Sequence, residues 1–327
     1  MDDYSDLSLD VHYYRDTGIS PEMRHVTIVY RFVFVVFLMS TYGRIIWTLI
    51  SQRKFRTNMA YLLIVNIGII NILFLLTMFW AAIMSINERT IGHNYLRGLT
   101  TAASYYRCLY FLAYFAFSFL LAINRLFVIT EWMIVPSLFY KCSVFITWLM
   151  VAAVFPVLFA HADEFASEYD VDFAMYISIG FMQDEVVQNV EIPLYVGILA
   201  VHVFLISTLI LKRKSLNQKW KLSSPEGRLA LQTALLFIPQ GLVFLSMKIL
   251  QTTSDGWKWL DVIVYARPRY IAIINVTHDL LPFFYLVVLI SFNIEIRKML
   301  KLPSGSPTTL KIYVSPNSAV MSTPRSR

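Results

Sequence analysis

Three ionisable residues of this chain stand inside apolar stretches, where ionised groups are rare. Arg107 follows Tyr105 and Tyr106, and His278 and Asp279 lie side by side ahead of a Leu-Leu-Pro sequence. Desolvating an ionised group is costly, so each of the three should be paired, hydrated or neutral, and each is a candidate for function. Their setting predicts recognition of a polar ligand group or a conformational switch rather than covalent chemistry.

Each candidate has two interpretations. Arg107 is either a cationic anchor for a carboxylate or other polar ligand group, or a side chain that reaches outward or pairs with an acidic loop. Asp279 either belongs to a polar switch or simply hydrogen-bonds Asn66 or Asn71 across a helix bundle. His202 is more readily an interior histidine than a ligand group, and tyrosines at helical spacing often only pack. The candidate ligand-binding residues are Tyr106, Arg107, Tyr110, His202 and His278.

The spacing of the reactive residues gives no support to enzymatic chemistry. The histidines are scattered without metal-ligand spacing, and the chain shows neither a phosphate-binding Gly-rich loop nor a nucleophile elbow. The two cysteines, Cys108 and Cys142, fall at different depths of neighbouring apolar runs, farther apart than a disulfide allows. We therefore expect no enzyme activity, no cofactor, no metal and no intrachain disulfide.

The composition indicates a protein dissolved in lipid. Of the 327 residues, 57% are hydrophobic and 15% charged, and the mean hydropathy is +0.59. Soluble domains are about a quarter charged. The isoelectric point near 9.3 does not indicate nucleic-acid binding, because the basic residues gather in short segments between apolar runs. These segments are better interpreted as signals of membrane topology.

Seven apolar runs are long enough to cross a bilayer, which takes about 20 residues at 1.5 Å each. They predict an all-α membrane protein built as a seven-transmembrane helix bundle. Arg31 and Arg44 lie towards the two ends of the first run, from which they could reach the lipid headgroups. The runs are 26–50, 61–83, 101–129, 142–160, 192–211, 229–250 and 270–290.

The charge of the connecting segments predicts the orientation. The segments on one side, including the tail, carry 17 Lys and Arg against three acids, whereas the other side carries 8 against 17 acids. The positive-inside rule places the first set in the cytosol, so the N-terminus lies outside and the C-terminus inside. The expected organisation is an extracellular N-terminus (1–25), a transmembrane domain (26–291), an amphipathic cytosolic helix (292–302) and a disordered cytosolic tail (303–327).

Motifs in the third and seventh runs resemble those of rhodopsin-like G-protein-coupled receptors. The third run ends in Asn124-Arg125-Leu126, similar to their acidic-Arg-aromatic triplet, with Asn in place of the acid and Leu in place of the aromatic residue. Pro282 and Tyr285 keep the Pro-x-x-Tyr half of their seventh-helix element. An arginine at the end of a helix is also an ordinary snorkelling anchor. Chain length and the sequences 121–125 and 293–297 are closest to the nematode-type serpentine chemoreceptors, the superfamily of the Srg, Srv, Srt and Srx groups.

The resemblance implies site residues for coupling and switching. Phe292, Ile296, Met299 and Leu300 would form the lipid-facing stripe of the amphipathic helix. Pro239 predicts a kink in the sixth helix. The G-protein coupling candidates are Asn124, Arg125, Lys212, Arg213 and Lys214, and the switch candidates are Pro239, Asp279, Pro282 and Tyr285.

The function implied by the resemblance is a chemosensory receptor in the plasma membrane or a sensory cilium. It would bind a small molecule or a peptide from outside and activate a heterotrimeric G protein inside, with membrane lipid as a further partner and no nucleic acid. Two alternatives stay open, namely a ligand-gated channel subunit or transporter, and a structural membrane protein without a ligand. The chain shows neither the paired broken helices nor the ladder of intramembrane charges typical of transport.

Overall fold

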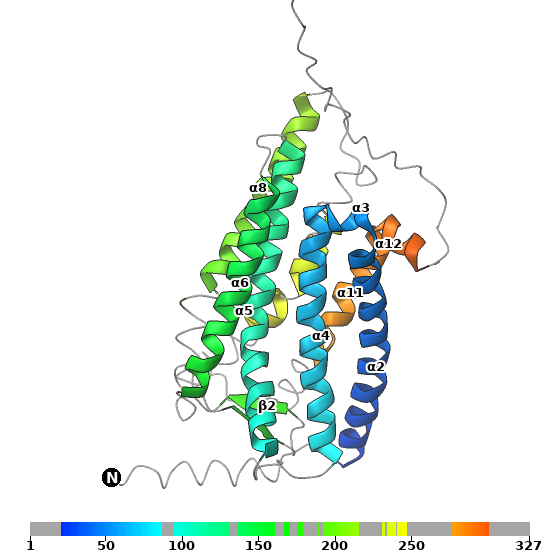
Figure 1. Cartoon of the computed structure of the whole chain (residues 1–327), viewed down its shortest axis with the longest axis vertical. Helices are drawn as coiled ribbons and strands as arrows, with labels where there is room; N and C mark the ends of the chain where they lie inside the picture. The colour runs from blue at the N-terminus through cyan, green and yellow to red at the C-terminus, as the bar shows by residue number, and fades with distance from the viewer. Residues whose placement is uncertain are drawn as a thin grey trace, which may run out of the picture.

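The computed structural model describes residues 21–86, 95–130, 136–160, 167–170, 175–178, 189, 192–215, 231–232, 234–239, 241–246 and 276–300. Within these ranges nearly all residues are helical, and Figure 1 shows the long helices side by side in one bundle. The helices are α2 (Pro21–Ser51), α3 (Arg53–Arg56), α4 (Met59–Ile86), α5 (Tyr95–Thr130), α6 (Ser137–Ala160), α8 (Ile192–Ser215), α11 (Leu281–Phe292) and α12 (Ile294–Met299).

Four helices of the described part are long and apolar enough to cross a membrane. These spans are Arg24–Ser51, Met59–Ile86, Leu109–Val128 and Ser137–Val154. Shorter apolar helices cover Ile192–Thr208 and Leu281–Phe292, and residues 234–239 and 241–246 are also helical. The five long helices α2, α4, α5, α6 and α8 match the first five predicted runs to within six residues at each end. The prediction of several helices long and apolar enough to cross a membrane is confirmed, and the full count of seven stays a prediction because much of the last two runs lies outside the described residues.

The helices differ in how much of their surface they bury. In α4, 67% of the spanning window is buried, against 11% in α6. The reason is position, because α4 packs between α2 and α5, whereas α6 lies at the far side of α5. The outer face of α6 exposes Leu138, Phe145 and Leu149. Exposed aliphatic and aromatic side chains of this kind suit a lipid solvent rather than water.

Aromatic side chains form the centre of the bundle between α2, α4, α5 and α11. Because the pattern of apolar residues has little periodicity, it is the polar groups and the largest rings that decide which face turns inward. The largest fully buried side chains include Tyr42, Tyr105, Tyr110, Tyr114, Tyr285, Phe74, Phe115 and Phe117.

The predicted seventh helix is interrupted where its proline requires it. Residues 276–279 form one helical turn, Leu280 is a turn residue, and α11 starts at Leu281 with Pro282 in its first turn. Proline has no N–H to donate to the carbonyl four residues earlier, so the ladder of hydrogen bonds is broken at this place. The predicted sixth helix is described in three short pieces, and Pro239 ends one of them. Residue 240 lies outside the described part, so the predicted kink stays untested.

Two short strands depart from the all-α expectation. β1 (Ser167–Asp170) and β2 (Met175–Ser178) pair antiparallel, with Tyr169 opposite Tyr176. They lie in the acidic segment 161–191, for which the sequence suggested only a loop. Figure 1 shows them at the end of the bundle where α5 begins, and β1 contacts α5.

The short helices α3 and α12 lie at the opposite end of the bundle (Figure 1). Asn293 caps α12, its side-chain oxygen accepting a hydrogen bond from the Ile296 backbone N–H at 3.2 Å. The predicted amphipathic helix is therefore present, but shorter than 292–302. Its orientation differs from the prediction, because Ile296 is fully buried in the core of the bundle instead of facing lipid. Ile296, with Leu300 packed against the core beside it, joins α12 to the protein.

Candidate functional site

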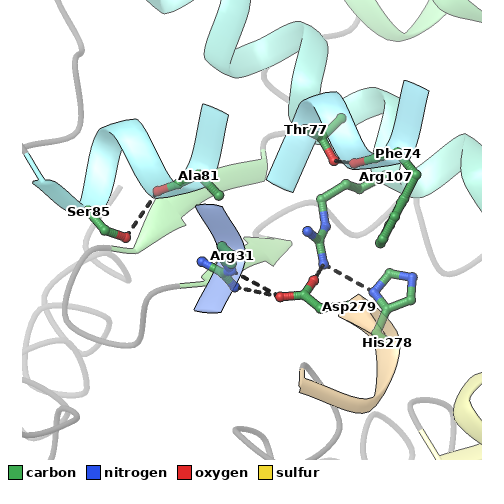
Figure 2. Close-up of polar contacts among 8 residues, drawn as sticks. All are labelled: Arg31, Phe74, Thr77, Ala81, Ser85, Arg107, His278 and Asp279. Carbon is green, nitrogen blue, oxygen red and sulfur yellow. Dashed lines mark hydrogen bonds and ion pairs between the residues drawn. The ribbon is translucent and has the colours of Figure 1, made fainter. Parts of the chain in front are cut away.

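A charged cluster joins three elements inside the bundle. Arg31 of α2 and Arg107 of α5 both contact Asp279, which lies in the helical turn before α11 (Figure 2). Their side chains are only 3%, 8% and 1% exposed. A buried charge without a partner would destabilise the fold by several kcal/mol. The opposite charges of Asp279 and the two arginines offset this cost for one another.

The two arginines contact Asp279 unequally. Arg31 donates twice to the carboxylate oxygen Oδ2, from Nε at 3.0 Å and from Nη2 at 2.9 Å. Arg107 donates once to Oδ1, from Nη2 at 3.1 Å. Because charge-assisted bonds gain from short distance and from multiplicity, the link to α2 is the stronger of the two.

His278 extends the cluster. Its Nδ1 lies 3.1 Å from Arg107 Nη2. A guanidinium has no acceptor, so Nδ1 must accept and the ring carries its proton on Nε2. The ring stacks on Phe111 with centroids 5.0 Å apart and meets the edge of Phe74 at 4.9 Å. The Arg107 guanidinium carbon also lies 4.9 Å from the centroid of Phe74, at cation–π distance.

The cluster revises three interpretations made from the sequence. Arg31 does not reach the headgroups, because its guanidinium turns into the bundle to bind Asp279. Arg107 does not reach outward either, since it is 8% exposed and bonded to His278 and Asp279. The alternative that Asp279 hydrogen-bonds Asn66 or Asn71 is wrong as well, because its carboxylate accepts from the two arginines. The structure brings Arg107, His278 and Asp279 together as a group.

Tyrosines of α5 tie that helix to its neighbours through their hydroxyl groups. Tyr106 donates to the carbonyl of Ile70 at 2.9 Å, and Tyr110 donates to Asn71 Oδ1 at 3.0 Å. Tyr114 donates to the carbonyl of Leu236 at 3.1 Å. Tyr106 and Tyr110 were expected to line a ligand pocket, but these hydroxyls bond neighbouring helices.

The bond from Tyr110 continues as a chain across the bundle. Asn71 Nδ2 donates to the Tyr42 hydroxyl at 3.1 Å, and that hydroxyl donates to the carbonyl of Pro282 at 2.6 Å. The chain therefore runs from α5 through α4 and α2 to the start of α11. Asn66 is engaged elsewhere, with its side-chain oxygen accepting from Trp148 Nε1 of α6 at 2.7 Å.

The other end of α5 holds a second buried arginine. Arg125 is 3% exposed and Asn124 is 7% exposed, so Arg125 is not a snorkelling side chain. Tyr61 at the start of α4 and Tyr285 of α11 interact with it electrostatically. The predicted coupling residues Lys212, Arg213 and Lys214 lie in the last turn of α8 rather than in a loop, because this helix continues to Ser215.

His202 lies apart from the charged cluster. It is 5% exposed, its Nδ1 donates to the Ile198 carbonyl at 2.8 Å, and its ring stacks on Phe237 at 5.2 Å. It borders a small cavity together with Tyr114, Ser118 and Tyr285, which has room for about one water molecule. This cavity is too small for an organic ligand, and the structure does not bring His202 to the other candidate ligand-binding residues.

Sequence reasoning missed two residues of this polar system. Arg31 was interpreted from its place near the end of an apolar run, and no local signal shows that it turns inward. Tyr42 is one of 19 tyrosines, and its role follows only from the partners the fold supplies. Cys142 is a free, exposed cysteine, as expected, and the side chain of Cys108 lies outside the described part.

Comparison with known proteins adds no family to these observations. No protein-family model matches the chain, and its sequence has no significant match among curated proteins. The likeness to serpentine receptors therefore depends on the short motifs at the ends of the third and seventh apolar runs.

Proposed function

We propose that this chain is a seven-helix chemosensory receptor of the plasma membrane, which binds a small extracellular ligand within its bundle and activates a cytosolic G protein. The observation that carries the proposal is the placement of two buried arginines on one helix, Arg107 at 12 residues after the first residue of α5 and Arg125 at five residues before its last. Arg107 belongs to the charged cluster, and Arg125 lies beside Tyr285. Arg125 follows Arg107 by 18 positions, which correspond to about 27 Å of helix, close to the thickness of a bilayer core.

The ends of the bundle support the proposed orientation. The end that carries α3 and α12 is basic, with Arg53, Lys54 and Arg56 in α3. β1 and β2 lie at the other end and belong to segment 161–191, which has eight acidic residues and no Lys or Arg. We therefore place α3, α12 and Arg125 in the cytosol and the charged cluster in the outer half of the bundle.

The seventh segment would connect the two ends. Asp279 is held by the charged cluster, and Tyr285 follows six residues later beside Arg125. A ligand that binds differently to two arrangements of this segment would shift the equilibrium between them. The arrangement with Arg125 accessible from the cytosol would offer guanidinium donors to backbone carbonyls of the G protein.

Nucleotide exchange by purified G proteins tests this function. The full-length chain in lipid nanodiscs should accelerate exchange on at least one class of heterotrimeric G protein above empty nanodiscs. Basal exchange is expected because Asn124 supplies no carboxylate next to Arg125. Arg125→Ala should lose most of this acceleration, whereas Arg297→Ala, on α12, should lose much less.

The controls separate this function from its alternatives. Both variants must reach the surface of expressing cells at wild-type density. Equal exchange by wild type and Arg125→Ala would contradict the coupling role of Arg125. Ion or solute flux through liposomes that contain the chain, without any nucleotide exchange, would favour a channel or transporter instead.

A further inference from the structure

Each element of the charged cluster also brings a buried polar atom that has no hydrogen-bond partner among the described residues. These atoms are Tyr30 Oη on α2, Ser104 Oγ on α5 and His278 Nε2 before α11. Ser104 is fully buried and His278 is 4% exposed. Buried polar atoms without partners are rare in proteins, and each one in a native structure calls for a physical reason.

The three atoms lie next to the charged residues. Tyr30 precedes Arg31 in the chain and interacts electrostatically with Asp279. Ser104 lies three residues before Arg107, on the same face of α5 and about 4.5 Å nearer to the end where this helix begins. His278 is bonded to Arg107 directly. The partnerless atoms therefore border the side of the cluster that faces the start of α5.

We propose that this side of the cluster binds the carboxylate, or a closely similar anionic group, of the receptor's ligand. His278 Nε2 carries a proton and can only donate, and the hydroxyls of Ser104 and Tyr30 are also able to donate. Two guanidinium groups and one carboxylate add a positive field to these donors. The aromatic rings around His278 exclude water, which strengthens hydrogen bonds to an anion.

The unequal bonds to Asp279 indicate which contact the ligand would replace. Arg107 makes one bond of 3.1 Å to Asp279, whereas Arg31 makes two bonds of 2.9 and 3.0 Å. An incoming carboxylate would therefore share or take over Arg107 and leave the Arg31–Asp279 pair intact. The three atoms are enclosed in this structure, so binding requires the surrounding helix ends to move apart.

Thermal stabilisation of the purified chain by simple carboxylates tests the inference. The probes are the straight-chain carboxylates from acetate to octanoate, each compared with the primary amide of the same length. A compound that binds the folded chain raises its unfolding temperature in proportion to the logarithm of its concentration above Kd. We expect carboxylates to raise this temperature. The Kd of the matched amide should be at least about tenfold higher, because hydrogen bonds to a charged acceptor are stronger than those to a neutral one.

The same Ser→Ala substitution at two positions, and a substitution of His278, locate the binding site. Ser104→Ala should weaken carboxylate binding about tenfold or more, while the unfolding temperature without carboxylate stays equal or rises, because a partnerless hydroxyl is removed. Ser118→Ala is the control, on the same helix about 21 Å farther along its axis, and should bind as tightly as the wild type. His278→Phe keeps a stacking ring, removes the Nε2 donor, and should also weaken binding.

The inference is overturned if no carboxylate of the series stabilises the chain, if amides do so equally, or if Ser104→Ala binds like the wild type. It deepens the proposed receptor function, on which it depends for the idea that a ligand enters the bundle at all. The two remain separable because binding is measured here without a G protein. Carboxylate binding without nucleotide exchange would support the binding site and contradict G-protein coupling. Nucleotide exchange without carboxylate binding would support G-protein coupling and contradict the binding site.

Discussion

The two buried arginines of α5 differ in what surrounds them. Arg107 faces the carboxylate of Asp279 and the ring of His278, and Arg31 approaches the same carboxylate from α2. Arg125 lies near Tyr61 and Tyr285, and the residue before it, Asn124, is neutral. Removing a buried carboxylate that two guanidinium groups share leaves both of them without that compensation, which is costly. The Arg107 region is therefore expected to contribute more to the stability of the bundle than exposed ion pairs do.

The largest expected effect comes from removing the carboxylate that holds the charged cluster. Asp279→Ala leaves two buried guanidinium groups without the carboxylate they share, and breaking buried ion pairs in this way costs about 3–5 kcal/mol. We expect the variant to be strongly reduced at the cell surface and to unfold at a much lower temperature in detergent. Glu295→Ala is the matched control, because its ion pair is exposed. Wild-type surface density and unfolding temperature for Asp279→Ala would remove the distinction between the two ends.

An intermediate effect is expected from the chain of hydrogen bonds between the two ends. Tyr42→Phe removes the hydroxyl that joins Asn71 to the Pro282 carbonyl. Hydrogen bonds between membrane helices contribute on average about 0.6 and at most about 1.7 kcal/mol, so the loss should lie in this range. Unfolding free energy measured in mixed detergent micelles checks it.

The control for Tyr42→Phe is the tyrosine stacked on it. Tyr285 lies 6.4 Å from Tyr42 between ring centroids, and its hydroxyl has no hydrogen-bond partner in the described part of the chain. Tyr285→Phe should therefore leave the unfolding free energy unchanged or raise it slightly. If both substitutions cost the same, ring packing rather than the hydrogen-bonded chain would account for the stability.

The smallest effect is expected at the surface of the Arg125 end. Lys54 Nζ lies 3.0 Å from Glu295 Oε2, and this hydrogen bond, together with the nearby Lys298, holds the pKa of Glu295 below its ordinary value. The pair should therefore stabilise α12 above the ordinary carboxyl pKa and lose this contribution as the pH falls through the lowered pKa. Exposed pairs contribute about 0.2–1 kcal/mol and weaken in salt.

Hydrogen exchange of the α12 amides can detect so local a change. Between neutral pH and a pH below the carboxyl range, the wild type should lose a few-fold protection beyond the intrinsic change in exchange rate. Glu295→Gln should show the lower protection already at neutral pH and no further pH dependence of this kind. A wild type and variant with identical pH profiles would show that the ion pair does not stabilise α12.

The helices were predictable because their signal is carried by consecutive residues. The length and composition of the first five apolar runs give α2, α4, α5, α6 and α8 to within six residues at each end, whereas the interruption at Leu280 was not predicted. The sequence predicted the following short helix from residue 292, whereas α12 begins at Ile294 after its cap Asn293.

The partners were not predictable, because they depend on how distant segments meet. Arg31 and Asp279 lie 248 residues apart, and nothing near either residue names the other. The sequence predicted that Ile296 faces lipid, but its side chain packs into the core of the protein, and lipid and a protein core attract the same side chains. The strands of segment 161–191 carry mixed polar residues, and their pairing was likewise not visible in the pattern.

The interruption at Leu280 has a mechanical consequence. Arg31 binds Asp279 just before the interruption, and Tyr42 binds the Pro282 carbonyl just after it. Arg31 and Tyr42 lie 11 residues, or about 16 Å, apart on α2. Because the chain on both sides of Leu280 is bonded to α2, the break at Leu280 cannot bend without moving relative to α2 or breaking one of these bonds. The first and seventh segments would then move together, and the contacts of Arg107 with Asp279 and His278 join them to α5.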